Sequence, residues 1–179
     1  MRKSIALAAV LTAASVAPLS ASAADGTITF NGQVTAQTCS IATPGGADFS
    51  VNLPTVISNS LSAAGETAGR TAFSIQLAEC DAGQVATYFE PGATVDFTTG
   101  RLNNQAAQNA AQNVQIQLLG GNGQFIPVVA SGTAQANSQW VQVDANGDAS
   151  LDYFAEYYAT GNAGAGDVST SIKYTIIYN

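Results

Sequence analysis

The stretch Thr27-Ile-Thr-Phe-Asn-Gly-Gln-Val-Thr-Ala36 alternates apolar and polar residues with the period of a β-strand. Its apolar row consists of Ile28, Phe30, Val34 and Ala36, and Gly32 is the only gap in that row. A glycine inside a strand marks a bulge or a place where another backbone or side chain comes close. The residues alone leave two alternatives open: the stretch pairs within its own sandwich, or it pairs with another molecule.

The chain before this stretch has the three parts of a secretory signal peptide. Arg2 and Lys3 supply a positive start, residues 5–16 are mostly Ala, Leu and Val, and Ala21-Ser22-Ala23 is a small-x-small cleavage site. A membrane-spanning helix would need about 20 apolar residues, and this run is shorter. The pattern therefore predicts an exported protein rather than one with a retained anchor.

Removal of residues 1–23 leaves 156 of the 179 residues, which is the length of one domain. No linker and no shift in composition divides this remainder. We therefore expect residues 24–37 to form an N-terminal extension and residues 38–179 to form one β-sandwich domain.

The mature chain would be strongly acidic and poor in charge of either sign. It keeps Arg70, Arg101 and Lys173 against twelve Asp and Glu, a side-chain balance of −9. This sign disfavours nucleic acid and anionic membranes as partners. Charged residues make up 9% of the chain. The remaining polar surface is Thr, Ser, Asn and Gln, which suits packing against copies of the same chain.

The two cysteines, Cys39 and Cys80, predict one disulfide in an exported protein. Closing a loop of about 40 residues contributes roughly 4 kcal/mol in the chain-entropy description. The chain has no His, so a zinc site is excluded. A calcium loop starting at Asp144 fails because Ala149 and Ala155 stand where such loops need Gly and Glu. We expect no metal and no cofactor.

Short alternating segments separated by turn signals fill the rest of the chain. The expected strands lie at Phe49–Leu53, Phe73–Leu77, Val85–Phe89, Val95–Phe97, Val114–Leu118, Phe125–Val129, Trp140–Val143, Leu151–Tyr157 and Ile172–Tyr178. Residues 58–70 show little periodicity and are expected as a loop. Residues 102–113 have no apolar stripe and are expected as a polar crossing loop rather than a helical turn. No amphipathic helix of ten residues is present, so the pattern predicts an antiparallel β-sandwich.

Residues for catalysis are scarce. The chain lacks His, an unpaired Cys, a nucleophile elbow and a phosphate-binding loop. The carboxylate pairs Asp144/Asp148 and Asp152/Glu156 would suit a glycosidase by residue type. They lie on a turn or alternate with strand residues, a pattern typical of a solvated face. We therefore predict that the chain has no catalytic residues and is not an enzyme.

Several segments resemble the major subunits of chaperone-usher fimbriae, the type 1 pilin family. They are Phe73-Ser-Ile-Gln-Leu-Ala-Glu-Cys80, Asn113-Val-Gln-Ile-Gln-Leu118, Tyr157-Tyr-Ala-Thr-Gly161 and Ile172-Lys-Tyr-Thr-Ile-Ile-Tyr-Asn179. The cysteine spacing, the penultimate Tyr178, Gly166 at the fourteenth position from the end and Phe30-Asn-Gly-Gln-Val34 add to the likeness. It extends over the whole mature chain.

The resemblance implies an incomplete immunoglobulin-like β-sandwich that lacks its last strand and is completed by a donated one. A periplasmic chaperone would first fill the resulting groove, and the extension of the next subunit would replace it. Under this hypothesis the donor residues Ile28, Phe30, Gly32, Val34 and Ala36 face the groove. The chaperone-recognised edge would consist of Ile172, Tyr174, Ile176, Tyr178 and Asn179.

The resulting hypothesis is a structural subunit of a surface pilus that mediates cell adhesion and is secreted through the periplasm by an outer-membrane usher. Head-to-tail donation between identical subunits does not close, so it builds a filament. A minor adaptor or anchor subunit shares this architecture and stays open as an alternative. A fimbrial adhesin or lectin is the other alternative, but a tip adhesin of this family would carry a separate N-terminal binding domain ahead of the pilin domain, for which 156 residues leave no room.

Overall fold

The computed structural model describes residues 28–29, 32, 39–129 and 135–179. The chain divides into two compact units, residues 1–35 and 36–179, and the second is the β-domain. Three predicted donor residues, Phe30, Val34 and Ala36, lie outside the described residues. Within the described part, no helix is long and apolar enough to cross a membrane.

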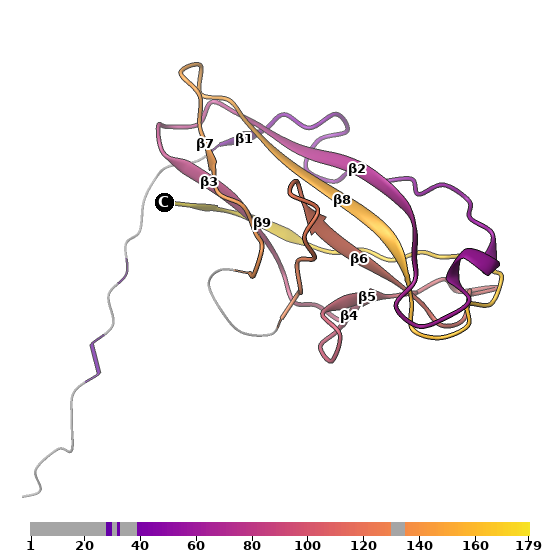
Figure 1. Ribbon diagram of the computed structural model, residues 1–179. Helices are drawn as coiled ribbons and strands as arrows, with labels where there is room; N and C mark the ends of the chain where they lie inside the picture. The colour runs from indigo at the N-terminus through magenta and orange to yellow at the C-terminus, as the bar shows by residue number, and fades with distance from the viewer. Residues whose placement is uncertain (1–27, 30–31, 33–38, 130–134) are drawn as a thin grey trace, which may run out of the picture. The chain divides into compact units, whose positions relative to one another are not determined.

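The described domain is built from two antiparallel sheets (Figure 1). The larger sheet has the order β1-β2-β8-β6-β5-β4, and the smaller has the order β7-β3-β9. The strands are β1 (Ser40–Ile41), β2 (Thr67–Ala78), β3 (Gln84–Phe89), β4 (Val95–Asp96), β5 (Arg101–Asn103), β6 (Val114–Gly120), β7 (Val141–Gln142), β8 (Ala149–Ala159) and β9 (Tyr174–Tyr178), and one 3-10 helix spans Ser58–Leu61. The predicted all-β architecture is confirmed.

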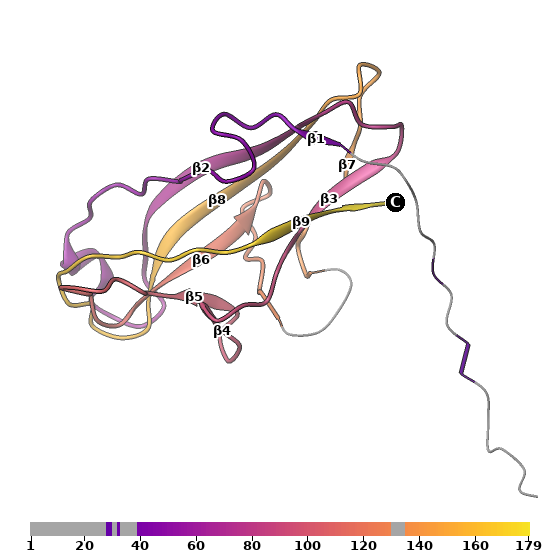
Figure 2. The ribbon, with the colours of Figure 1, turned by 180° about the vertical axis from the view of Figure 1, so that it is seen from behind.

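The core is built from side chains of both sheets, whose strands Figures 1 and 2 show from opposite sides. Its most buried large side chains are Ile75, Leu77, Val85, Phe89, Ile126, Val128, Leu151 and Tyr153. The Tyr153 and Phe89 rings meet edge to face, with their centroids 5.2 Å apart. Burial of each large apolar side chain contributes roughly 1.5–3 kcal/mol. The alternation in the sequence therefore marks the inward faces of the long strands correctly.

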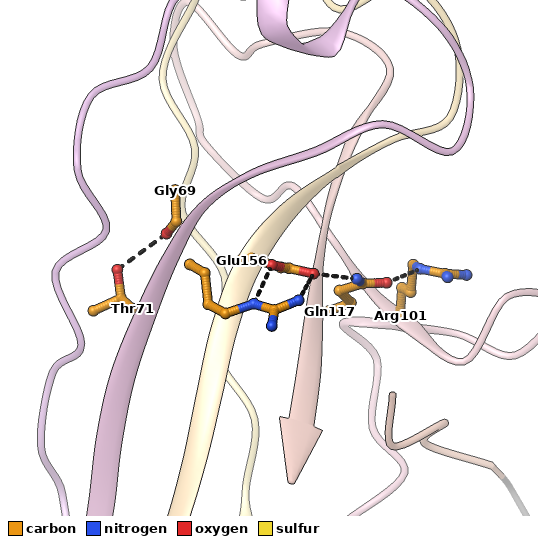
Figure 3. A network of polar contacts seen from close by, with 6 residues as sticks. Gly69, Thr71, Arg101, Gln117 and Glu156 are labelled. Carbon is orange, nitrogen blue, oxygen red and sulfur yellow. Dashed lines mark hydrogen bonds and ion pairs between the residues drawn. The ribbon is translucent and has the colours of Figure 1, made fainter. Parts of the chain in front are cut away.

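Several expected element boundaries are wrong. Residues 58–70 are not a loop, because they contain the 3-10 helix and the first residues of β2. A β-bulge between Ala68 and Thr71 shifts the register there, and the Thr71 hydroxyl donates to the Gly69 carbonyl at 3.0 Å (Figure 3). A bulge breaks the period of two, so the sequence shows no alternation across it.

Other expected strands are shorter than predicted or absent. Residues 49–53 contain no strand, and residues 125–129 contribute only a bridge from Phe125 to Leu119. β4 stops at Asp96, whose carboxylate accepts the Thr98 N–H at 2.9 Å and starts a turn that leaves Phe97 54% exposed. β5 takes the first residues of the expected 102–113 loop.

The disulfide joins Cys39 to Cys80, with the two Cα atoms 4.3 Å apart. It lies beside the pairing of Ser40 with Ala78, where β1 meets the end of β2. The predicted link between these two strands is confirmed.

A chain of polar contacts crosses four strands of the larger sheet (Figure 3). The buried Glu156 accepts from Arg70 Nε at 2.8 Å and from Gln117 Nε2 at 2.6 Å. Gln117 Oε1 in turn accepts from Arg101 Nε at 3.0 Å. The Arg101 guanidinium lies 3.6 Å from the centroid of the Tyr158 ring. These contacts link β2, β8, β6 and β5, and they give the buried carboxylate the partners that its burial requires.

The loop before β9 passes tightly over residues 109–111. The Asp167 N–H donates to the Asn109 carbonyl at 2.7 Å, and the Ala111 N–H donates to the Asp167 carbonyl at 3.0 Å. A Cβ atom on Gly166 would lie 2.6 Å from the Ala111 nitrogen and closer still to the Asn109 oxygen. Only glycine therefore fits where the chain is directed toward β9.

Gly166→Ala is expected to destabilise the domain by roughly 1–3 kcal/mol, because backbone must move to admit the methyl group. Gly164→Ala is the matched control, since a Cβ there meets its nearest atom at an ordinary 3.5 Å. Urea unfolding of the purified subunits measures both changes. Equal midpoints for the two variants would contradict the steric argument.

Glu156→Gln is expected to lower the free energy of unfolding by roughly 1–3 kcal/mol, because it removes the charged partner of Arg70. Asp148→Asn is the control, since that carboxylate lies on an exposed turn. Urea unfolding of the purified subunits measures this change as well. Equal unfolding midpoints for Glu156→Gln and Asp148→Asn would contradict the prediction.

Candidate functional site: a groove beside the last strand

A groove of about 1060 Å³ runs between residues 47–53 and residues 168–176. Its floor is made of core side chains contributed by both sheets: Phe73, Ile75, Phe89, Leu102, Ile116, Leu118, Ala155 and Tyr157. The groove thus reaches the centre of the sandwich from outside. Figure 2 shows the chain that leads into β9 running along the length of the domain.

β9 forms one wall of the groove, and it has an unpaired edge. Its residues pair with β3, from Val85 opposite Tyr178 to Phe89 opposite Tyr174. No other described strand pairs with β9. An edge strand of this kind presents unpaired backbone donors and acceptors to any chain that lies alongside it.

The opposite wall, residues 47–53, runs without strand pairing. Two contacts join it to β9 across the groove. The Tyr174 hydroxyl donates to the Ala47 carbonyl at 2.9 Å, and the Phe49 and Tyr174 rings lie edge to face with centroids 6.4 Å apart. Burial, with a smaller effect from Asp48, raises the pKa of Tyr174. The phenol therefore keeps its proton and its role as donor.

The end of β9 is fixed by hydrogen bonds rather than by the groove. The Tyr178 hydroxyl accepts the Cys39 N–H at 3.1 Å, beside the disulfide. Asn179 and Gln84 exchange both backbone hydrogen bonds, at 3.0 and 3.1 Å. The last residue is thus held in register with β3.

The structure brings together three of the five residues predicted for the groove edge. Ile172, Tyr174 and Ile176 line the groove, whereas Tyr178 and Asn179 do not. Sequence reasoning missed the lining residues 168–171, which belong to no strand. The only sequence signal for them was Val168, an isolated apolar residue in a polar loop.

Two of the five predicted donor residues lie within the described part of the chain. Ile28 is 79% exposed, and a Cβ atom on Gly32 would meet no atom within 4 Å. The donor assignment therefore remains a prediction.

The acidic turn at Asp144 has a structural explanation. The carboxylate accepts the backbone N–H groups of Asp148 and Asn146 at 2.9 and 2.8 Å, and these bonds lower the pKa of Asp144. Among the described residues, no group of three or more Cys, Asp or Glu is arranged to hold a metal ion.

Comparison with known proteins places these features in a family. The family described as type-1 fimbrial protein, A matches residues 53–179. The chain is 66% identical over 165 residues to the major fimbrial subunit SMF-1 of Stenotrophomonas maltophilia (strain K279a), covering 91% of this chain and 98% of that protein. It is 47% identical over 162 residues to the F17 fimbrial protein of Escherichia coli, covering 86% and 87% of the two chains.

The fold is also found in a solved structure of a chaperone-usher pilus, with a TM-score of 0.61, 21% identity, and coverage of 87% of this chain and 96% of that one. This likeness confirms the expected immunoglobulin-like sandwich. Because the family match extends over most of the chain and the relatives align nearly end to end, the chain belongs to the type-1 fimbrial protein family and is a structural subunit of a fimbrium.

Proposed function

We propose that this chain is a major pilus subunit that polymerises by donor-strand exchange. Residues 24–37 of one subunit enter the groove of the next and pair with the free edge of β9. The observation that carries the proposal is a groove floored by core side chains beside a strand with a single partner. A strand added there completes the smaller sheet and satisfies the open edge.

The chemistry of the extension suits this groove. Residues 27–36 contain no charged side chain, and their apolar row alternates as an inserted strand requires. The groove lining is mainly apolar, and Asp48 and Lys173 are its only charged members among the described residues. Each large apolar side chain buried there contributes roughly 1.5–3 kcal/mol.

The remaining partners follow from the same open edge. A subunit with an unfilled groove is prone to pair wrongly, so a periplasmic chaperone covers the edge until an outer-membrane usher delivers the subunit to the fibre. The finished filament lies at the cell surface and mediates adhesion. The 66% identity to a major fimbrial subunit favours the major role over that of a minor adaptor or anchor. Identifying the most abundant polypeptide of the purified native filament tests this choice.

Gly32→Asn is expected to abolish filaments while leaving the subunit folded. In a neighbour's groove the added amide would clash and lose its hydration, at a cost of a few kcal/mol. In its own chain a Cβ at this position has free space. Electron microscopy of cells that carry only this form measures the effect.

Gln33→Asn is the matched control, because the same residue type is introduced on the face predicted to point away from the groove. It should give filaments at normal density. The Gly32→Asn subunit should remain soluble with its disulfide formed. Normal pilus density with Gly32→Asn would remove the basis for the donor assignment.

Deleting Tyr178 and Asn179 is expected to prevent capture by the chaperone. The deletion removes the hydroxyl that accepts the Cys39 N–H and both bonds to Gln84, and it moves the terminal carboxylate out of register. Co-purification of the subunit with the chaperone measures capture. Tyr178→Phe keeps the ring and the chain end, so it should still be captured. Recovery of a normal complex from the truncated chain would refute this prediction.

A further inference from the structure

A second hollow, of about 520 Å³, lies over β2 and β8 and shares only Phe73 with the groove. Ser74 pairs with Asp152 across the two strands, and both alternate with the buried Ile75 and Leu151. Their side chains therefore point away from the core. The polar and aromatic side chains that the argument uses are Ser74, Gln139, Trp140, Asp152 and Phe154, and they line the hollow together with the small Ala72.

The floor of the hollow carries an oriented carboxylate. Asp152 Oδ1 accepts from the Ser74 hydroxyl at 2.7 Å and from the Ser150 hydroxyl at 2.9 Å. Asp152 Oδ2 has no hydrogen-bond partner within the described part of the chain. The two hydroxyl protons are used by Oδ1, so the floor offers mainly acceptors to a ligand.

An oriented amide stands on the wall. Gln139 Oε1 accepts the Asn122 N–H at 3.1 Å, which fixes the amide plane. Its Nε2 group makes no hydrogen bond to any described residue and is left as a donor. The hollow thus combines a fixed acceptor and a fixed donor in one site.

Trp140 supplies an aromatic surface beside these groups. It is 39% exposed, and it is the only tryptophan of the chain. An indole that is solvent-exposed at the rim of a polar hollow has an apolar surface available for contact with a ligand. Phe154, another aromatic residue of the lining, already has the guanidinium of Arg70 5.9 Å from its ring centroid.

We propose that this hollow binds an uncharged saccharide. The hydroxyl groups of a sugar both donate and accept, which matches Asp152 Oδ2 and Gln139 Nε2, and the apolar C–H face of a sugar ring stacks on an indole. The hollow has the volume of a small-molecule site, about 300–1,000 Å³. Asp152 and the acidic chain repel anionic sugars. An organic ammonium ion is disfavoured because Arg70 already lies over Phe154. The inference concerns the subunit surface and does not depend on strand donation.

The emission of Trp140 tests the proposal in purified filaments. The probes are the trisaccharide of N-acetylglucosamine, lactose and a mannose disaccharide, with sialyllactose and tetramethylammonium as the charged comparisons. At least one neutral probe should shift the Trp140 emission saturably at millimolar concentration. Neither charged probe should give a shift of equal size. A shift with a charged probe alone, or with no probe, would overturn the proposal.

Matched variants test whether a shift in the Trp140 emission arises from binding in the hollow. Asp152→Asn keeps the side-chain shape and should weaken binding by about tenfold, the effect of losing one charge-assisted hydrogen bond. Ala72→Leu fills the floor at an exposed position and should abolish the shift while filaments still form. Asp148→Asn lies on a separate turn and should leave the affinity unchanged. A shift that survives both Asp152→Asn and Ala72→Leu would place the ligand elsewhere and refute the site.

Discussion

The free edge of β9 is the constraint on which the rest of the domain depends. In a closed sandwich both edges of a sheet end in loops or short strands that keep water and other chains from the core. Here β9 has β3 on one side and a groove on the other. The domain accordingly anchors β9 at both of its ends, through the tight passage at Gly166 and through the hydrogen bonds of Tyr178 and Asn179. A strand fixed in this way can present its edge without losing its register.

The periodicity of the sequence predicted the strands that are long and buried on one face. β2, β6, β8 and β9 were found near their expected positions because each places apolar side chains inward at every second residue. The alternation did not predict the strand boundaries where the backbone departs from regular strand pairing. The bulge at Gly69 hid the first part of β2, and the turn at Asp96 ended β4 before Phe97. Both departures depend on hydrogen bonds that no period reveals.

The candidate site could be predicted only in part, for a different reason. Ile172, Tyr174 and Ile176 were found because they alternate along the sequence, although β9 itself begins only at Tyr174. The facing wall is residues 47–53, which belong to no strand. The contact of Tyr174 with Ala47 spans 127 positions of the sequence. A groove between such distant segments arises from the tertiary structure, so the local sequence pattern does not predict it.

Under the proposed function, an inserted strand would also displace contacts that the walls of the groove make with each other. The floor residues Phe89 and Leu118 are only 2% and 5% exposed, so the wall side chains partly cover them. The Phe49–Tyr174 ring pair and the Tyr174–Ala47 hydrogen bond each hold the walls together by about 0.5–1.5 kcal/mol. An inserted strand that buries three large apolar side chains gains several times roughly 1.5–3 kcal/mol and adds backbone hydrogen bonds. Under the proposed donor-strand exchange, the gain would exceed the loss for an extension of matching apolar pattern, whereas a weakly apolar segment would not repay the displaced wall contacts. On that proposal, the paired Phe49 and Tyr174 rings would select against short or polar chains, and the alternation of residues 27–36 would be the feature that overcomes them.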